Sequence, residues 1–445
     1  MITHLTAPLF HKPPHWPSSP SLWLFAAALF MSPLSGVRPF PEASYGDILF
    51  GLSCAAAIVE RLYEREMVYV FWGYLLAAAL VTASYVANLI EPEHMGAYEY
   101  MQFIDISLKN HLQVVFDQAP NFRVIFISAI IFPQAFLLLR ARSFDELRTL
   151  VLIWTAGACY GAIFAVLNCW GWLGDYDDHF WTTIHRASGL TAHPNAMALS
   201  TVLAFPGLLL LFLEAQNLVL RASAVLLALV AWQAIGYSGS RTAVYTLAFM
   251  SVIGLGLMIG DVPRHQRLRL AAGVALVLLI GVLARYWSGP SAEYSAIWRL
   301  ENGSATSDTL RATNQEIAKA GFLNAPVFGQ GYQWLRVAHN MYLQMLHSAG
   351  LVGFLGFILA MGFPLYMTWR TREEHQAPER RRFRNCLLVG ALGVLVWGWA
   401  QPNINALNPT IPFGLLLYLG AMTVANGRVT VPNAEPLEPA ASLRA

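Results

Sequence analysis

The feature that most constrains the fold is a succession of long apolar segments that follow one another through most of the chain. A helix needs about 20 apolar residues to cross a bilayer, and we count twelve segments near this length, at 22–37, 43–59, 67–90, 122–139, 149–170, 192–213, 219–235, 242–260, 268–286, 345–369, 386–401 and 409–426. Charged residues make up only 12% of the chain, against about 25% in a soluble domain. The sequence therefore predicts an all-α polytopic membrane protein with about twelve transmembrane helices.

The lysines and arginines of the loops set the expected orientation of these helices. Eighteen of the 28 lie in short segments that the orientation places in the cytoplasm: 1–21, 60–66, 140–148, 214–221, 261–269, 370–384 and 428–445. Because cytoplasmic loops carry an excess of positive charge, we expect both chain ends inside. The predicted order is a cytoplasmic segment 1–21, nine helices over 22–286 with external loops 91–121 and 171–191, a large external loop 287–344, three helices over 345–427, and a cytoplasmic tail 428–445.

Several function classes are disfavoured by what the sequence lacks. A net charge of +2 gives no reason to expect a nucleic-acid partner, and the four cysteines form no CxxC pair that would indicate a disulfide framework or a thiolate metal site. His339 and His347 are eight residues apart with no carboxylate beside them, so we expect neither a metal nor another cofactor. A secondary transporter is disfavoured, because proton relays need ionisable groups deep in the membrane and the acidic residues sit at the ends of the apolar segments.

The loop 287–344 is expected to contain a helix of its own. Ser307 and Asp308 are placed to cap a helix that runs to Gly321. Arg311, Gln315 and Ala318 would then share one helix face. The alternative is a helix that lies on the membrane surface with its arginine toward lipid phosphate.

A polar cluster follows this helix, after Pro326 and a turn at Gly329 and Gly331. Its members are Arg336, His339, Asn340, Tyr342, Gln344 and His347. The sequence predicts that they lie on the projecting end of one unbroken helix that continues to Trp369, with His339 about 16 Å above the hydrocarbon core at 1.5 Å per residue. Polar residues at the end of a membrane helix indicate a site. The alternative is a belt of interfacial anchors.

Three arginines on the expected external side stand out. Arg241 follows a turn at Gly236 and Gly239 and opens a helix, where its charge and the helix dipole would both attract an anion. Arg186 precedes another helix start that holds His193 and Asn195, although His193 could be a simple helix cap, and Arg311 is the third. The guanidinium fork fits phosphate oxygens. The alternative for each is an arginine that snorkels to lipid headgroups.

These motifs together resemble the O-antigen ligase and polymerase family. The resemblance lies in Phe328-Gly329-x-Gly331, in His339-Asn340-x-Tyr342-Leu343-Gln344-x-Leu346, in Gly350-Leu351-x-Gly353, and earlier in His193-Pro194-Asn195 and Ser238-x-Ser240-Arg241-Thr242, with Arg311 ahead of the glycine turn. It covers residues 185 to 353 in motif and the whole chain in topology. The motifs are loose singly, but their order and shared external placement are fairly specific.

The resemblance implies an inverting, metal-independent glycosyltransferase of the GT-C type in the bacterial inner membrane, with its site on the periplasmic side. The donor would be a glycan on undecaprenyl diphosphate and the acceptor a sugar hydroxyl of lipid A-core, as in an O-antigen ligase of lipopolysaccharide biosynthesis. His339 would be the catalytic base and Arg186, Arg241 and Arg311 would bind the diphosphate, with support from His193, Asn195, Arg336, Asn340, Tyr342 and Gln344. The alternatives are an O-antigen polymerase and a flippase or transporter of lipid-linked oligosaccharides.

Overall fold

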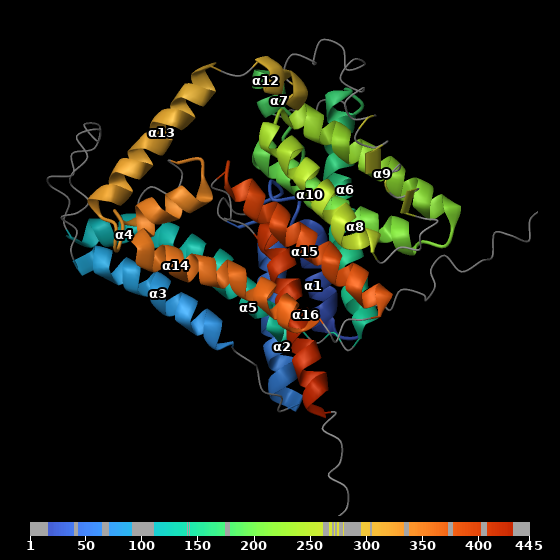
Figure 1. Cartoon of the computed structure of the whole chain (residues 1–445), viewed down its shortest axis with the longest axis horizontal. Coiled ribbons are helices and arrows are strands. Elements are labelled where there is room, and N and C mark those ends of the chain that lie inside the picture. The colour runs from blue at the N-terminus through green and yellow to red at the C-terminus, as the bar shows by residue number, and fades with distance from the viewer. Residues whose placement is uncertain are drawn as a thin grey trace, which may run out of the picture.

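The computed structural model shows an all-helical protein (Figure 1). It describes residues 17–39, 43–64, 71–90, 111–139, 143–173, 179–260, 295–302, 305–332, 338–372, 377–401 and 407–429, together with Ala141 and a few positions in 267–279. Over this part the helices are α1 (Pro20–Met31), α2 (Tyr45–Glu64), α3 (Trp72–Ile90), α4 (His111–Ile125), η4 (Phe126–Ile131), α5 (Phe132–Ala135), η5 (Phe136–Leu138), α6 (Phe144–Cys169), α7 (His179–Ile184), α8 (Pro194–Glu214), α9 (Leu218–Ser238), α10 (Arg241–Ile259), α12 (Ala296–Asn302), α13 (Ala305–Asn324), α14 (Met341–Arg370), α15 (Pro378–Gly398) and α16 (Leu407–Val429).

Seven helical stretches in the described residues are long and apolar enough to cross a membrane, which confirms a polytopic membrane protein but not the number twelve. They are Trp72–Ile90, Gln118–Leu138, Phe144–Cys169, Pro194–Glu214, Leu218–Ser238, Arg241–Ile259 and Met341–Arg370. Four further predicted spans coincide with α1, α2, α15 and α16. The first of these, α1, has only 12 residues, or about 18 Å at 1.5 Å per residue. The predicted span 268–286 lies mostly outside the described residues.

The helix α16 forms the centre of the helical body (Figure 1). Every residue from Leu407 to Gly420 is buried, and α16 packs against α14, α15, α5 and α8. A helix that is apolar on all sides is stable only where other helices surround it. Gly414 allows one of these close approaches, because a Cβ there would lie 2.4 Å from the ring of Phe136.

The chain ahead of α5 is helical over more residues than expected. The predicted external loop 91–121 ends in a helix, since α4 begins at His111. It continues through a π-helical segment, η4, into the short α5, which is followed by a single turn of 3₁₀ helix, η5. Residues 91–110 of that loop lie outside the described residues.

The expected helix in the large loop is present as α13, but its ends differ from the prediction. It begins at Ala305, so Ser307 and Asp308 lie in its first turn and do not cap it, and it runs past Gly321 to Asn324. The predicted face is confirmed, because Ala318 is fully buried and Arg311 and Gln315 are half-buried. Figure 1 shows α13 lying across one end of the helical body, between α12 and the pair α4 and α14.

The prediction of one unbroken helix through the polar cluster was wrong, because α14 breaks at Gly350. That residue has φ 60° and ψ −166°, a conformation open almost only to glycine. The segment Pro326–Gly331 packs against the break: Gln330 N–H and Gly331 N–H donate to the carbonyl oxygens of His347 and Ser348 at 2.7 and 3.0 Å. The N–H groups of Leu351 and Val352 donate to Pro326 and Val327 at 2.8 and 3.1 Å.

These four hydrogen bonds replace the two intrahelical bonds that the break removes. In an unbroken helix Leu351 and Val352 would donate to His347 and Ser348. Residues of α3 fix the inserted segment further, since Ser84 Oγ donates to the carbonyl oxygens of Phe328 and Ala349 at 3.0 and 2.7 Å, and Asn88 Nδ2 donates to that of Phe328 at 2.7 Å. The segment that contains Gly329 and Gly331 is therefore held by hydrogen bonds to α14 at the break at Gly350.

Candidate functional site

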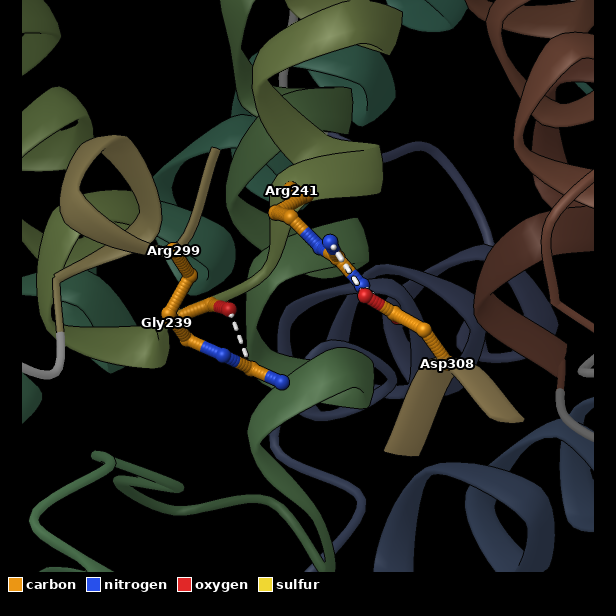
Figure 2. Close-up of polar contacts among 4 residues, drawn as sticks. All are labelled: Gly239, Arg241, Arg299 and Asp308. Atoms are coloured by element: carbon orange, nitrogen blue, oxygen red, sulfur yellow. Dashed lines mark hydrogen bonds and ion pairs between the residues drawn. The ribbon is translucent and has the colours of Figure 1, made fainter. Parts of the chain in front are cut away.

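Arg241 stands at the turn between α9 and α10, where the sequence placed it. Gly239 ends α9 with φ 62°, which glycine adopts without strain, and the chain reverses into α10 at Arg241. Both terminal nitrogens of Arg241 contact the carboxylate of Asp308 in the first turn of α13, with Nη1 3.0 Å from Oδ2 and Nη2 bonded to Oδ1 (Figure 2). The guanidinium fork is thus engaged in the two-point manner that suits carboxylates and phosphates.

A fourth arginine, Arg299, lies beside this pair and was not expected from the sequence. Its Nη1 donates to the carbonyl oxygen of Gly239 at 2.7 Å (Figure 2). It lies on the short helix α12, which Ser295 opens by accepting from the N–H of Trp298 at 3.2 Å. Ser295 was the only local signal for this helix, and nothing in the sequence connects Arg299 with a turn 60 residues earlier.

Arg186 contacts the same turn. Its Nε donates to the carbonyl oxygen of Ser238 at 2.8 Å, and its Nη2 donates to Asn195 Oδ1 at 2.9 Å. Asn195 Nδ2 in turn donates to Gln401 Oε1 at 3.2 Å, so the chain after α15 also contributes to the cluster. Gln401 is buried and was not predicted.

Burial and neighbouring positive charges lower the pKa values of three of these arginines. Burial, followed by the charges of Arg299 and Arg311, lowers the pKa of the Arg186 guanidinium to about 9. Burial and the charge of Arg241 likewise lower the pKa of Arg311, while Asp308 acts in the opposite direction. Asp308 has the same opposing effect on the pKa of Arg299, which burial, Arg241 and Arg311 lower. The cluster therefore concentrates positive charge around a single carboxylate among the residues described here, as an anion site requires.

His339 lies next to this charge, in a turn and not on the helix that the sequence predicted. Its φ is 47°, and α14 begins two residues later because Asn340 Oδ1 accepts the N–H groups of Tyr342 and Leu343, each at 3.0 Å. The side chain is half-buried, and its buried Nδ1 has no hydrogen-bond partner among the described residues. Burial, and then the charge of Arg311, lowers its pKa. The imidazole is therefore held neutral beside a positive cluster.

The other residues of the predicted site hold the backbone in place. Gln344 Oε1 accepts from the N–H of Ala338 at 3.0 Å and Gln344 Nε2 donates to Ser348 Oγ at 2.9 Å, which fixes the turn at His339. The hydroxyl of Tyr342 donates to the carbonyl oxygen of Leu395 at 2.6 Å. His193 is the helix cap of α8, since its Nδ1 accepts from the N–H of Asn195 at 3.1 Å.

The structure thus brings together Arg186, Arg241, Arg311 and His339, with Asn195 holding Arg186, and it adds Arg299, Asp308 and Gln401. Arg336 lies outside the described residues. Among the described residues, no group of three or more His, Cys, Asp and Glu is placed to hold a metal ion.

An apolar pocket of about 100 Å³ lies apart from this cluster. Its lining comes mainly from α8, α9, α10 and α15 and includes Phe205, Leu208, Ala228, Leu247, Met250 and Val389. Leu247 is six residues after Arg241 in α10, or about 9 Å further along the helix axis. The pocket holds little polar surface, so the chemistry of the molecule is better sought at the arginine cluster.

A comparison of the chain with protein-family models found no match, and neither did a comparison with curated protein sequences.

Proposed function

We propose that this protein is a metal-independent, inverting glycosyltransferase of the GT-C type that acts as an O-antigen ligase. The observation that carries the proposal is the meeting of four arginines and a histidine from separate parts of the chain, namely Arg186, Arg241, Arg299, Arg311 and His339. The motif resemblance to the O-antigen ligase and polymerase family supports it. The donor would be a glycan on undecaprenyl diphosphate and the acceptor a sugar hydroxyl of lipid A-core.

The arginines would hold the leaving group. When the acceptor oxygen attacks the anomeric carbon, the bond from that carbon to the phosphate oxygen breaks and its electron pair stays on the diphosphate. Fixed positive groups aimed at such a developing charge lower the barrier. Arg241 and the guanidinium group of Arg299 lie at the same turn, after α9, which makes both of them candidates to contact one diphosphate.

His339 would accept the proton of the attacking hydroxyl. A general base must be neutral at the working pH, and an imidazole is well matched to this task near pH 7. The lowered pKa of His339 keeps it in this form. Asn340 and Gln344 would act by fixing the turn that carries it, as positioning residues that do not touch the substrate.

The test is transfer in vitro with purified full-length protein, a defined undecaprenyl-diphosphate glycan and two acceptors in separate reactions. Transfer to lipid A-core, but not to a second lipid-linked glycan, is the expected result. Transfer to the lipid-linked glycan alone would make the protein a polymerase. Donor movement across liposome membranes without any transfer to either acceptor would overturn the enzyme proposal in favour of a flippase.

The matched variant is His339→Ala. A positioned general base contributes about 10²–10⁴ in rate, so transfer should fall by that factor while donor binding is retained by the arginines. If donor binding falls in proportion to the rate, His339 is a binding residue.

Transfer is also expected to persist in EDTA, and a loss that Mg²⁺ or Mn²⁺ restores would contradict the metal-independent mechanism.

A further inference from the structure

The guanidinium fork of Arg241 is occupied by a carboxylate of the protein itself. Asp308 contacts both terminal nitrogens of Arg241, from a helix that lies 67 residues later in the chain (Figure 2). A two-point contact of this kind is the one an arginine makes with two oxygens of a phosphate. Asp308 therefore stands where the proposed mechanism would put an oxygen pair of the donor diphosphate.

The pair is open to solvent, so another anion can reach it. The side chain of Asp308 is 40% exposed and that of Arg241 is 20% exposed. Water and salt screen an ion pair that is partly exposed, and a diphosphate offers more negative charge and more oxygen atoms to the same arginines. If one anion replaces the other, the arginine cluster has a negatively charged partner both before and after binding.

The helix that carries Asp308 is anchored at its opposite end. Near the carboxyl end of α13, the carbonyl oxygen of Gly321 accepts from Gln330 Nε2 at 3.1 Å, and Gln330 N–H donates to the carbonyl oxygen of His347 at 2.7 Å. Ala318 of α13 is fully buried. Release of Asp308 from Arg241 would thus leave the contacts at the other end of α13 in place.

We propose that Asp308 is an internal counterion of Arg241 that the donor diphosphate displaces, and that it thereby sets the affinity of the site for donor and product. The proposal rests on the proposed function for the identity of the anion. Asp308 takes no part in the transfer step itself. Its return to Arg241 after transfer would favour release of undecaprenyl diphosphate.

The experiment measures binding of inorganic pyrophosphate by the full-length protein in detergent, with and without Asp308→Asn. Exposed ion pairs contribute up to about fivefold to an equilibrium, and this pair is only partly exposed, so the variant should bind pyrophosphate at least about twofold more tightly than wild type. Glu316→Gln is the matched control: it removes the same charge from the same helix, where Glu316 pairs with exposed Lys319, and should leave binding unchanged.

A double-variant comparison separates displacement from a general change of charge. In an Arg241→Ala background the gain from Asp308→Asn should be clearly smaller, because the competition for the Arg241 fork no longer exists and only the effect of Asp308 on Arg299 and Arg311 remains. A gain of equal size in both backgrounds would overturn the proposal, as would binding that is unchanged or weaker in Asp308→Asn. Asp308→Glu, which keeps the carboxylate, should remain within about twofold of wild type.

Transfer assays on the same variants distinguish this inference from the proposed function. If wild type transfers glycan but Asp308→Asn shows no lower KM for the donor, the counterion role is wrong and the enzyme assignment stands. If no protein transfers glycan while Asp308→Asn still gains affinity for pyrophosphate through Arg241, the counterion role stands and the ligase assignment is wrong.

Discussion

His339 lies in the turn before α14 with φ 47°, and Asn340 caps the helix one residue later. Its side chain is half-buried, and its Nδ1 has no hydrogen-bond partner among the described residues. The neutral imidazole beside Arg311 leads to a prediction about pH.

The transfer rate should depend on the protonation of His339. Burial and the charge of Arg311 both lower its pKa, so the imidazole stays neutral to a lower pH than the ordinary value of about 6.5. The midpoint of the fall in rate, as the imidazole protonates, should therefore lie at a lower pH than the ordinary pKa of histidine. Arg311→Gln removes a positive charge and should move this fall to higher pH.

The measurement is a pH profile of single-turnover transfer at saturating donor. His339→Gln supplies the control, because glutamine does not titrate. The transfer rate of this variant should be much lower than that of wild type and should not fall further over this pH range. An identical acid limb in wild type and His339→Gln would assign the titration to another group and remove His339 from the role of base.

The arginines predict a graded response to substitution. Loss of one preorganised donor to a developing negative charge costs about 10²–10³ in rate, so Arg241→Ala or Arg311→Ala should reduce transfer by this factor. Lysine in either place should restore only part of the activity, because it lacks the planar fork. The rates are compared with that of Arg370→Ala, which changes an exposed arginine at the far end of α14. Near-normal transfer in both cluster variants would instead indicate arginines that contact lipid headgroups.

Local patterns identified three of the four arginines, but they did not reveal their partners. Arg241 could be singled out because a glycine turn and a helix start adjoin it. Its contact with Asp308 and the contact of Arg299 with Gly239 join residues 67 and 60 positions apart. Such pairs depend on how the helices pack, and the spacing of residues in one sequence does not contain that information.

At the scale of the element, Gly350 is the residue on which the join between α14 and the preceding loop depends. A Cβ at this position would lie 2.4 Å from the carbonyl oxygen of Val327 and 2.5 Å from the backbone nitrogen of Gly329. The φ of 60° is also unfavourable for alanine, at about 1–3 kcal/mol for the backbone alone. Gly350→Ala should therefore lower the thermal stability of the protein in detergent and displace the segment that leads to His339.

The control is Gly362→Ala in the same helix, where a Cβ would meet nothing within 4 Å and alanine is favoured over glycine by about 0.5–1 kcal/mol. Stability is followed by thermal unfolding and the site by transfer rate. Equal melting temperatures for the two variants would show that the break at Gly350 is not needed for the fold.

Periodicity and apolar length predicted where helices would be, and packing decided where they end. The face of α13 with Arg311, Gln315 and Ala318 followed from helical spacing and was confirmed. The predicted start of α13 was wrong because Ser307 and Asp308 are residue types that often cap helices, whereas here both lie inside the first turn. The break in α14 was missed because a glycine in a membrane helix is common, and only the inserted loop makes this one necessary.

At the scale of the whole molecule, composition was sufficient for the class of fold and insufficient for the number of spans. Apolar runs exclude a soluble fold regardless of which helices touch. They do not distinguish a helix that crosses the membrane from one that is short and packed against protein along one face, as α1 is, with Leu22, Phe25 and Leu29 fully buried. The predicted orientation of the helices across the membrane rests on a separate property, which is the distribution of lysines and arginines among the loops.

The orientation can be tested at two exposed alanines on opposite sides of the predicted membrane. Ala312 lies on α13 and Ala377 just before α15, and both are exposed. Because the loop around 377 is rich in arginine, the positive-inside rule places it in the cytoplasm and α13 outside. In intact cells, a membrane-impermeant maleimide should therefore label Ala312→Cys, and should label Ala377→Cys only after the membrane is opened. Wild type, with its four native cysteines, gives the background. Labelling of Ala377→Cys in intact cells with none of Ala312→Cys would reverse the topology, and it would place the arginine cluster on the cytoplasmic side, where a periplasmic ligase could not use it.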